Sequence, residues 1–180
     1  MLPASKVSNA ATAILGALMA IGLMLTAQTA MAGEAKVNWI APEKFTDIRS
    51  ANETQENAQA NLIKTFDGIF ADLAKRLPDG YQLEINVTDL DLAGEIRHGF
   101  AGGLQDVRVV KAIDWPKISF SYSLKNDKQE VVASGKEDLR DMDFQSKPDF
   151  SYSGFRYEEQ MLKDWFKHQQ RKDVFPTRDK

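Results

Sequence analysis

Residues 81–95, YQLEINVTDLDLAGE, decide the fold that we predict for this chain. In the first half of this stretch every second residue is apolar, the pattern of a strand with one solvent-facing side and one core-facing side. The alternation continues in Leu90 and Leu92, but one position out of step. Because a shift of one residue turns every following side chain to the other face of a sheet, we predict a β-bulge or bend near Thr88 and Asp89.

Two amphipathic helices are predicted, one before this strand and one near the end of the chain. The first can be capped by Asn52 or Thr54 and ends before Pro78-Asp79-Gly80. The second begins near Ser153, which could cap it, and its last turn is basic, as favours a helix C-terminus. Their apolar stripes, with steps of three and four, are Leu62, Phe66, Ile69, Phe70, Leu73 and Leu77, and Tyr157, Met161, Leu162, Trp165 and Phe166.

The remaining strands are predicted from shorter alternating segments. These lie at residues 35–40, 107–110, 117–124 and 130–139, with Asn126-Asp127-Lys128 as the turn that joins the last two. We therefore predict an α+β fold: a single two-layer domain over residues 33–180, with a mostly antiparallel sheet of four to five strands and two packed helices in the order β-α-β-β-β-α. Polar residues on the other side of the strands predict a free sheet face, and residues 175–180 are expected to form a frayed tail.

The N-terminal segment has the form of a cleavable secretory signal peptide. Lys6 is the only charged side chain before Glu34, and an apolar run over residues 10–27 leads to the small residues Ala30 and Ala32. We predict cleavage of residues 1–32 after Ala32 and, in a Gram-negative bacterium, a periplasmic location. The alternative is an uncleaved anchor, although the run is slightly shorter than the ~20 apolar residues that a membrane span needs.

Composition excludes several classes of function. The chain has 23 Lys+Arg and 26 Asp+Glu, and this balance argues against a nucleic-acid binder, which needs a basic face. It has no cysteine and only two histidines far apart in the sequence, so neither thiol chemistry nor a zinc site is expected. Ser134-Gly135 lies within a predicted strand and not in a nucleophile elbow. We assign no catalytic residue, no metal ligand and no cofactor.

The candidate binding residues lie at the acidic end of residues 81–95 and in the glycine-containing loop that follows. Asp89 and Asp91 are two apart on a strand, so they share a face and, with Glu95, could hold a hard cation. The ligand spacing of a calcium loop is absent, however, and solvated carboxylates paired with Lys or Arg account better for the pattern. His98 could act as a general base, although an exposed loop histidine is the simpler interpretation. The full set of candidates is Asp89, Asp91, Glu95, Arg97, His98 and Phe100.

Several segments carry a resemblance to a known family. They are Val37-Asn38-Trp39, residues 42–48, the nine-residue run at 87–95, Trp115-Pro116, and Tyr157-Glu158 with residues 161–165. In these segments the chain resembles a family of exported bacterial proteins catalogued as a domain of unknown function (number 3016). The resemblance covers nearly all of the predicted mature chain. It implies a secreted or periplasmic protein of undetermined activity and supplies no catalytic residue.

Two hypotheses about function follow. The first is a non-enzymatic binding or envelope-associated module that contacts an unknown protein or envelope component through the free sheet face or the loops at residues 96–105 and 146–154. The second is a small metal-dependent enzyme or metal binder built around Asp89, Asp91, Glu95 and His98. Convergence of these four side chains in one concave pocket would favour the second hypothesis, and dispersal would favour the first. We prefer the first, because the usual catalytic constellations are missing.

Overall fold

The structure is a computed structural model that describes residues 32–99, 105–147 and 153–178. Most of the predicted signal peptide, residues 1–31, and the candidate residue Phe100 lie outside these ranges. Cleavage after Ala32 therefore stays a prediction. Among the described residues no helix has the length and apolar character needed to cross a membrane.

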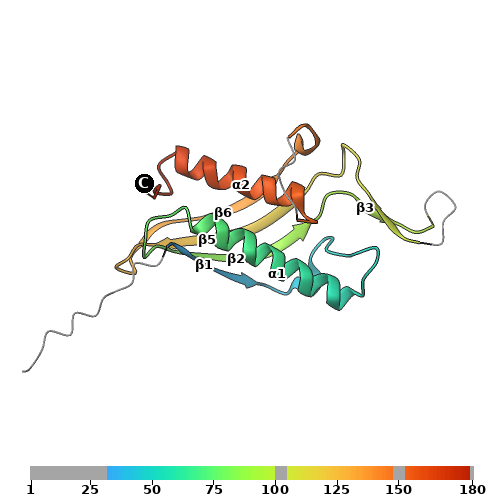
Figure 1. The fold of residues 1–180 in the computed structure, drawn as a ribbon, viewed down its shortest axis with the longest axis horizontal. Helices are drawn as coiled ribbons and strands as arrows, with labels where there is room; N and C mark the ends of the chain where they lie inside the picture. The colour runs from blue at the N-terminus through green and yellow to red at the C-terminus, as the bar shows by residue number, and fades with distance from the viewer. Residues whose placement is uncertain (1–31, 100–104, 148–152, 179–180) are drawn as a thin grey trace, which may run out of the picture.

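The main sheet has four strands in the order β1-β2-β5-β6 (Figure 1). They are β1 (Glu34–Trp39), β2 (Gln82–Asp91), β5 (Lys117–Lys125) and β6 (Val131–Arg140). β5 is antiparallel to both of its neighbours, β2 and β6, whereas β1 runs parallel to β2 because helix α1 (Gln55–Ala74) carries the chain back between them. The predicted α+β fold with a mostly antiparallel sheet is confirmed.

The predicted irregularity in β2 is present. The register between β2 and β5 shifts between Val87 and Asp89, so one extra residue stands on β2 at Thr88. After the shift Leu90 lies opposite Ile118 in the core, and Asp91 lies opposite Lys117 on the other face. The bulge thus turns the acidic residues at the end of β2 away from the helices.

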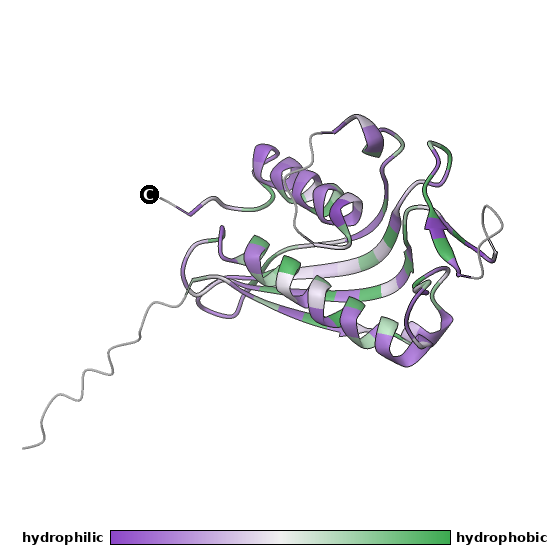
Figure 2. Cartoon of the chain, turned by 45° about the vertical axis from the view of Figure 1, so that its right-hand side comes forward, coloured by the Kyte–Doolittle hydropathy of each residue, from purple (hydrophilic) through white to green (hydrophobic). Residues whose placement is uncertain are grey.

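Both helices cover the same face of the sheet, and the strands alternate between hydrophobic and hydrophilic residues beneath them (Figure 2). Helix α1 is capped by Thr54, whose hydroxyl accepts a hydrogen bond from the Asn57 N–H group (3.3 Å). Helix α2 (Arg156–Arg171) begins after Phe155, which makes no side-chain cap. The predicted cap Ser153 is wrong, because it lies two residues before the helix N-cap and its hydroxyl donates to the Glu159 carboxylate instead (2.7 Å).

The core lies between the helices and the covered face. Phe66 and Phe70 of α1, Phe166 of α2 and Leu124 of β5 are almost completely inaccessible. Phe175 is also buried, with its ring 5.3 Å from that of Tyr122 between centroids. The segment expected to fray is therefore held as far as Arg178, because Phe175 fills the core and Arg178 forms an ion pair with Asp79 at 2.8 Å.

The strand predicted at residues 107–110 does not join the main sheet. It forms β4 (Val107–Val109), which pairs with β3 (Glu95–Arg97) in a separate antiparallel hairpin. Two short 3-10 helices, η1 (Pro42–Lys44) and η3 (Phe144–Ser146), complete the described elements. The uncovered face of the main sheet carries polar side chains, including Asn86 and Ser121, as the alternation predicts.

Candidate functional site

The candidate site lies where β2 ends and the chain turns into the β3–β4 hairpin. The turn is made at Gly94, whose φ of +86° is rarely adopted by residues with a side chain. A Cβ atom at this position would lie only 2.6 Å from the Val109 carbonyl oxygen. Gly94 therefore allows β4 to approach the end of β2 closely.

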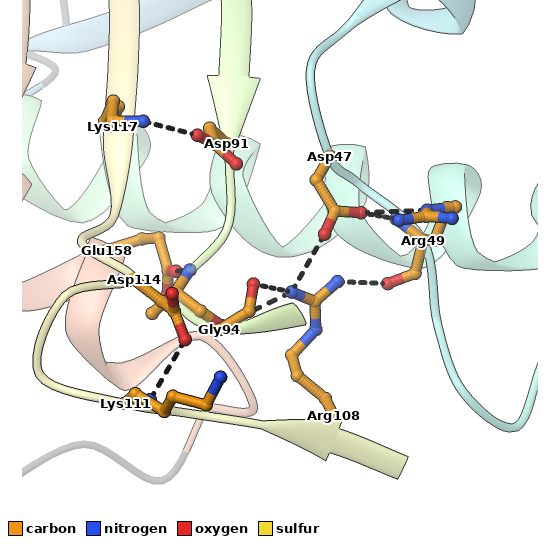
Figure 3. Close-up of polar contacts among 10 residues, drawn as sticks. Asp47, Arg49, Asp91, Gly94, Arg108, Lys111, Asp114, Lys117 and Glu158 are labelled. Carbon is orange, nitrogen blue, oxygen red and sulfur yellow. Dashed lines mark hydrogen bonds and ion pairs between the residues drawn. The ribbon is translucent and has the colours of Figure 1, made fainter. Parts of the chain in front are cut away.

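Arg108 of β4 fixes the hairpin to the body of the protein (Figure 3). Its Nη1 donates to the carbonyl oxygens of Ala93 (3.3 Å) and Gly94 (3.0 Å), and its Nη2 donates to the carbonyl of Arg49 (2.8 Å). Nη1 also lies 3.2 Å from Oδ2 of the buried Asp47. One guanidinium thus joins the hairpin, the end of β2 and the connector before α1.

Asp47 is itself built into the sheet. Its backbone N–H donates to Leu90 (3.2 Å), its carbonyl accepts from Leu92 (3.0 Å), and it forms a parallel bridge opposite Asp91. Its Oδ1 accepts hydrogen bonds from the backbone N–H and the Nε of Arg49 (3.1 and 3.2 Å). The carboxylate therefore lies between two arginines, which compensate its burial.

Glu158, in the first turn of α2, is the second buried carboxyl group of the site. It is only 3% exposed, and its Oε1 accepts a hydrogen bond from the Ala93 N–H group at 2.8 Å. Burial raises the pKa of Glu158 above its ordinary value, although the Ala93 N–H group and the charge of Arg108 both act in the opposite direction. This residue ties the end of β2 to α2, so three parts of the fold meet at residues 92–94.

A hollow of about 680 Å³ opens beside this network. It lies between the connector before α1, the end of β2, strand β4 and the start of α2. Arg49, Arg108 and Glu158 line it, together with the apolar side chains of Leu92 and Val110. The hollow is therefore mixed in character, with charged groups set among apolar ones.

The structure places the predicted acidic residues with separate partners. Asp89 accepts hydrogen bonds from the backbone N–H and the hydroxyl of Thr46, both at 2.7 Å. Asp91 accepts a hydrogen bond from Lys117 at 2.8 Å. Both side chains lie on the uncovered face of the sheet, as their spacing predicts, but each has its own partner.

The predicted hairpin residues are likewise paired. Glu95 accepts hydrogen bonds from Lys111 (2.9 Å) and Arg97 (2.6 Å), which lower its pKa to about 2. Nδ1 of His98 lies 2.8 Å from the Asp106 carboxylate. None of Asp89, Asp91, Glu95, Arg97 and His98 lines the 680 Å³ hollow. Within residues 32–99, 105–147 and 153–178 no group of three or more His, Asp and Glu side chains is arranged to hold a metal ion.

One of three comparisons with known proteins gave a match. A family model described as "Protein of unknown function (DUF3016)" matches residues 33–168. The chain belongs to this family. A search of curated proteins and a search of solved structures gave no match.

In this DUF3016 domain the nine-residue run at 87–95 contains the bulge, the end of β2 and the turn into the hairpin. The sequence analysis missed Asp47, Arg108 and Glu158 as members of the site. A signal existed for Glu158, which lies three and four residues before Met161 and Leu162 and thus on the buried stripe of its helix. Arg108, in the run of valines that forms β4, carried no comparable signal.

Proposed function

We propose that this DUF3016 protein is an exported binding module without catalytic activity, and that it contacts a protein or envelope component through its β3–β4 hairpin. Export is inferred from the charge and hydropathy of residues 1–32. The hairpin stands away from the two-layer body in Figure 1. Its strands pair with each other and lie outside the main sheet.

The observation that carries the proposal is the anchoring of this hairpin at its base. A two-stranded hairpin alone is at best marginally stable in water, so its shape must be supplied by contacts elsewhere. Arg108 and Gly94 supply those contacts. A fixed base reduces the entropy lost on binding, which is the usual benefit of a preorganised surface.

The side chains on the hairpin are suited to recognition. His98 is 77% exposed and Arg97 40% exposed, and Val107 adds exposed apolar surface. Asp89, Asp91, Glu95 and His98 have separate partners and do not converge on one pocket, which favours a binding surface over a metal-dependent catalytic centre.

A site-specific photocrosslinking experiment tests the proposal. A photoreactive residue is placed at position 98 of the full-length protein in its native cells, with position 64 on the exposed side of α1 as the control. We expect a discrete crosslinked partner from position 98 and none from position 64. The partner is then purified, and its affinity is measured for R97A/H98A and for K64A. We expect a loss of about tenfold or more for the hairpin variant only, since interface energy concentrates in few residues.

Equal crosslinking from both positions, or equal affinity of both variants, would contradict a hairpin interface. Export has a separate test, because the mature protein should begin at Gly33 and occur in the periplasmic fraction. Retention of residues 1–32 on the purified protein would contradict the predicted cleavage.

A further inference from the structure

The hollow lies beside the polar contacts of Arg108 and Glu158 with residues 92–94, which we call the anchor of the hairpin. It has the dimensions of a small-molecule site. Its volume of about 680 Å³ falls within the ~300–1,000 Å³ range of ligand pockets. Part of its wall is apolar and is made by buried Leu92 and Ala93 with Val107 and Val110. Such a wall can take the hydrocarbon part of a small ligand but not its charge.

Glu158 brings a buried polar atom to this hollow. The side chain is 97% inaccessible, and Oε1 accepts the hydrogen bond from Ala93. The carboxyl group also interacts with the backbone N–H group of Glu158 itself, and no other residue of the described part of the chain donates a hydrogen bond to it. Burial raises the pKa of Glu158, which favours the neutral carboxylic acid. In that form the carboxyl group has one O–H group, which can donate to an acceptor in the hollow that Glu158 lines.

Arg49 brings a positioned cation to the same hollow. Its Nε donates to Asp47, and its carbonyl accepts from Arg108, so both its backbone and the base of its guanidinium are held. The two Nη nitrogens donate to no acceptor among the described residues. A guanidinium with both Nη groups available matches the two oxygens of a carboxylate.

The wall of the hollow carries three arginines, Arg49, Arg108 and Arg156, and three acidic residues, Glu53, Asp106 and Glu158. Asp106 lies beside His98, and Glu53 accepts a hydrogen bond from Asn61 (2.7 Å). Arg108 adds a second positive charge close to Glu158 and is only 21% exposed. With Glu158 protonated, the three arginines outnumber the two remaining carboxylates of the wall, which favours an anionic ligand.

We propose that the hollow binds a small organic carboxylate, with its carboxylate group on the Nη atoms of Arg49, its hydrocarbon part against Leu92 and Val110, and Glu158 as a hydrogen-bond donor. The hollow is lined by Asp106 and Val107 of the hairpin but not by Arg97 or His98, so the proposal does not depend on a partner contact at Arg97 and His98.

Titration of the ¹⁵N-labelled mature protein with hexanoate, 1-hexanol and hexylammonium tests the proposal. The three probes share a hydrocarbon chain and differ in charge. We expect hexanoate to give saturable shifts of the amide signals of Ala93 and Val110 with a Kd of about 1 mM or tighter, within the reach of so small a ligand. Hexanol and hexylammonium should bind at least about tenfold more weakly, because they cannot pair with a guanidinium.

The matched variants are Arg49→Gln and Arg97→Gln, which remove the same charge inside and outside the hollow. Both arginines are partly exposed and pair with a nearby carboxylate, so both variants should fold. We expect Arg49→Gln to weaken hexanoate binding by about tenfold and Arg97→Gln to change it less than twofold. Arg49→Lys keeps the positive charge but loses the two parallel N–H donors of the guanidinium. Its affinity for hexanoate should lie between that of the wild type and that of Arg49→Gln.

The proposal is overturned by the absence of saturable shifts up to about 20 mM hexanoate, which is far above the expected Kd. If hexanol bound as tightly as hexanoate, the hollow would bind only the hydrocarbon chain and would not recognise the carboxylate. If hexylammonium bound more tightly than hexanoate, the hollow would favour cations instead of anions. Equal effects of the Arg49 and Arg97 variants would also overturn it. None of these results bears on whether the hairpin binds a partner.

Discussion

Two regions of this protein are held together in different ways. Between the helices and the sheet, buried apolar side chains pack in a continuous cluster with many aromatic contacts. At the end of β2 the elements are joined by a few polar groups, chiefly Arg108, Glu158 and the backbone of residues 92–94. The first region spreads its stability over many contacts, whereas the second concentrates it in single residues.

This difference bears on function. A core of many small contacts resists local opening, whereas a polar connection depends on each donor and acceptor. The hairpin is attached by the second kind of connection, so its orientation can change while the core stays folded.

The largest effect is expected from Phe66→Ala in the core. Phe66 is inaccessible to solvent and packs against Trp39 and Phe155, with ring centroids at 6.0 and 5.4 Å. Loss of the ring should lower the free energy of unfolding by about 3–5 kcal/mol. Urea unfolding measures the change, with Lys64→Ala on the exposed side of the same helix as control. A cost below about 1 kcal/mol would show that Phe66 is not part of a close-packed core.

Sequence periodicity was enough to predict this region. All six apolar residues assigned to the first helix are buried, as are Ile118, Phe120, Tyr122 and Leu124 of β5. The spacing of apolar residues reflects the geometry of one helix or strand, so it can be interpreted locally. The bulge in β2 was predictable for the same reason, because it changes the parity of a single strand.

The next largest effect is expected from Arg108→Ala in the anchor. The variant leaves the carbonyls of Gly94 and Arg49 without this donor and removes one of the two arginines beside buried Asp47. We expect a loss of about 2–3 kcal/mol, since an unpaired buried group costs more than a surface ion pair.

Hydrogen exchange of the β4 amides should rise more than that of β5, because the hairpin is released before the core opens. The control is Lys111→Ala, which removes an exposed ion pair to Glu95 and should cost less than about 1 kcal/mol. Equal losses for the two variants would contradict the role assigned to Arg108.

The anchor itself could not be predicted from the sequence. Its contacts join residues that are far apart in the sequence: Ala93 and Glu158 are separated by 65 positions, and Arg49 and Arg108 by 59. No local pattern encodes such pairs. The acidic residues Asp89 and Asp91 were prominent in the sequence, but the structure pairs them with Thr46 and Lys117, whose proximity depends on the complete sheet.

A smaller effect, with opposite signs in the two regions, is expected from Gly→Ala substitutions. Gly94→Ala places a Cβ atom 2.6 Å from the Val109 carbonyl at a φ of +86° and should cost about 1–3 kcal/mol. Gly68 lies in α1, and a Cβ atom added there would meet no neighbouring atom within 4 Å, so Gly68→Ala should stabilise by about 0.5–1 kcal/mol. Thermal unfolding of the two variants measures whether each substitution lowers or raises the stability of the protein. Stabilisation by Gly94→Ala would mean that the turn accepts another conformation.

The stability of the polar connection at the end of β2 should also depend on pH, through Glu158. In the unfolded chain Glu158 has its ordinary pKa of 4.5, whereas burial raises the pKa in the folded state. Between these two pKa values the folded protein keeps a proton that the unfolded chain has lost. The contribution of Glu158 to stability is therefore complete below pH 4.5 and is lost as the pH rises through the folded pKa. The loss amounts to about 1.4 kcal/mol for each unit by which the pKa is raised.

Glu158→Gln should remove this dependence, because the amide is neutral and its oxygen can still accept the hydrogen bond from Ala93. The free energy of unfolding of the wild type, minus that of the variant, should fall as the pH is raised from about 4 to 8. Glu43→Gln on the exposed connector controls for the loss of one carboxylate. A difference that grows with pH would mean that the charge of Arg108 outweighs burial at Glu158. The anchor would then be held by an ion pair, and the hollow beside it would lack the neutral carboxyl group that favours an anionic ligand.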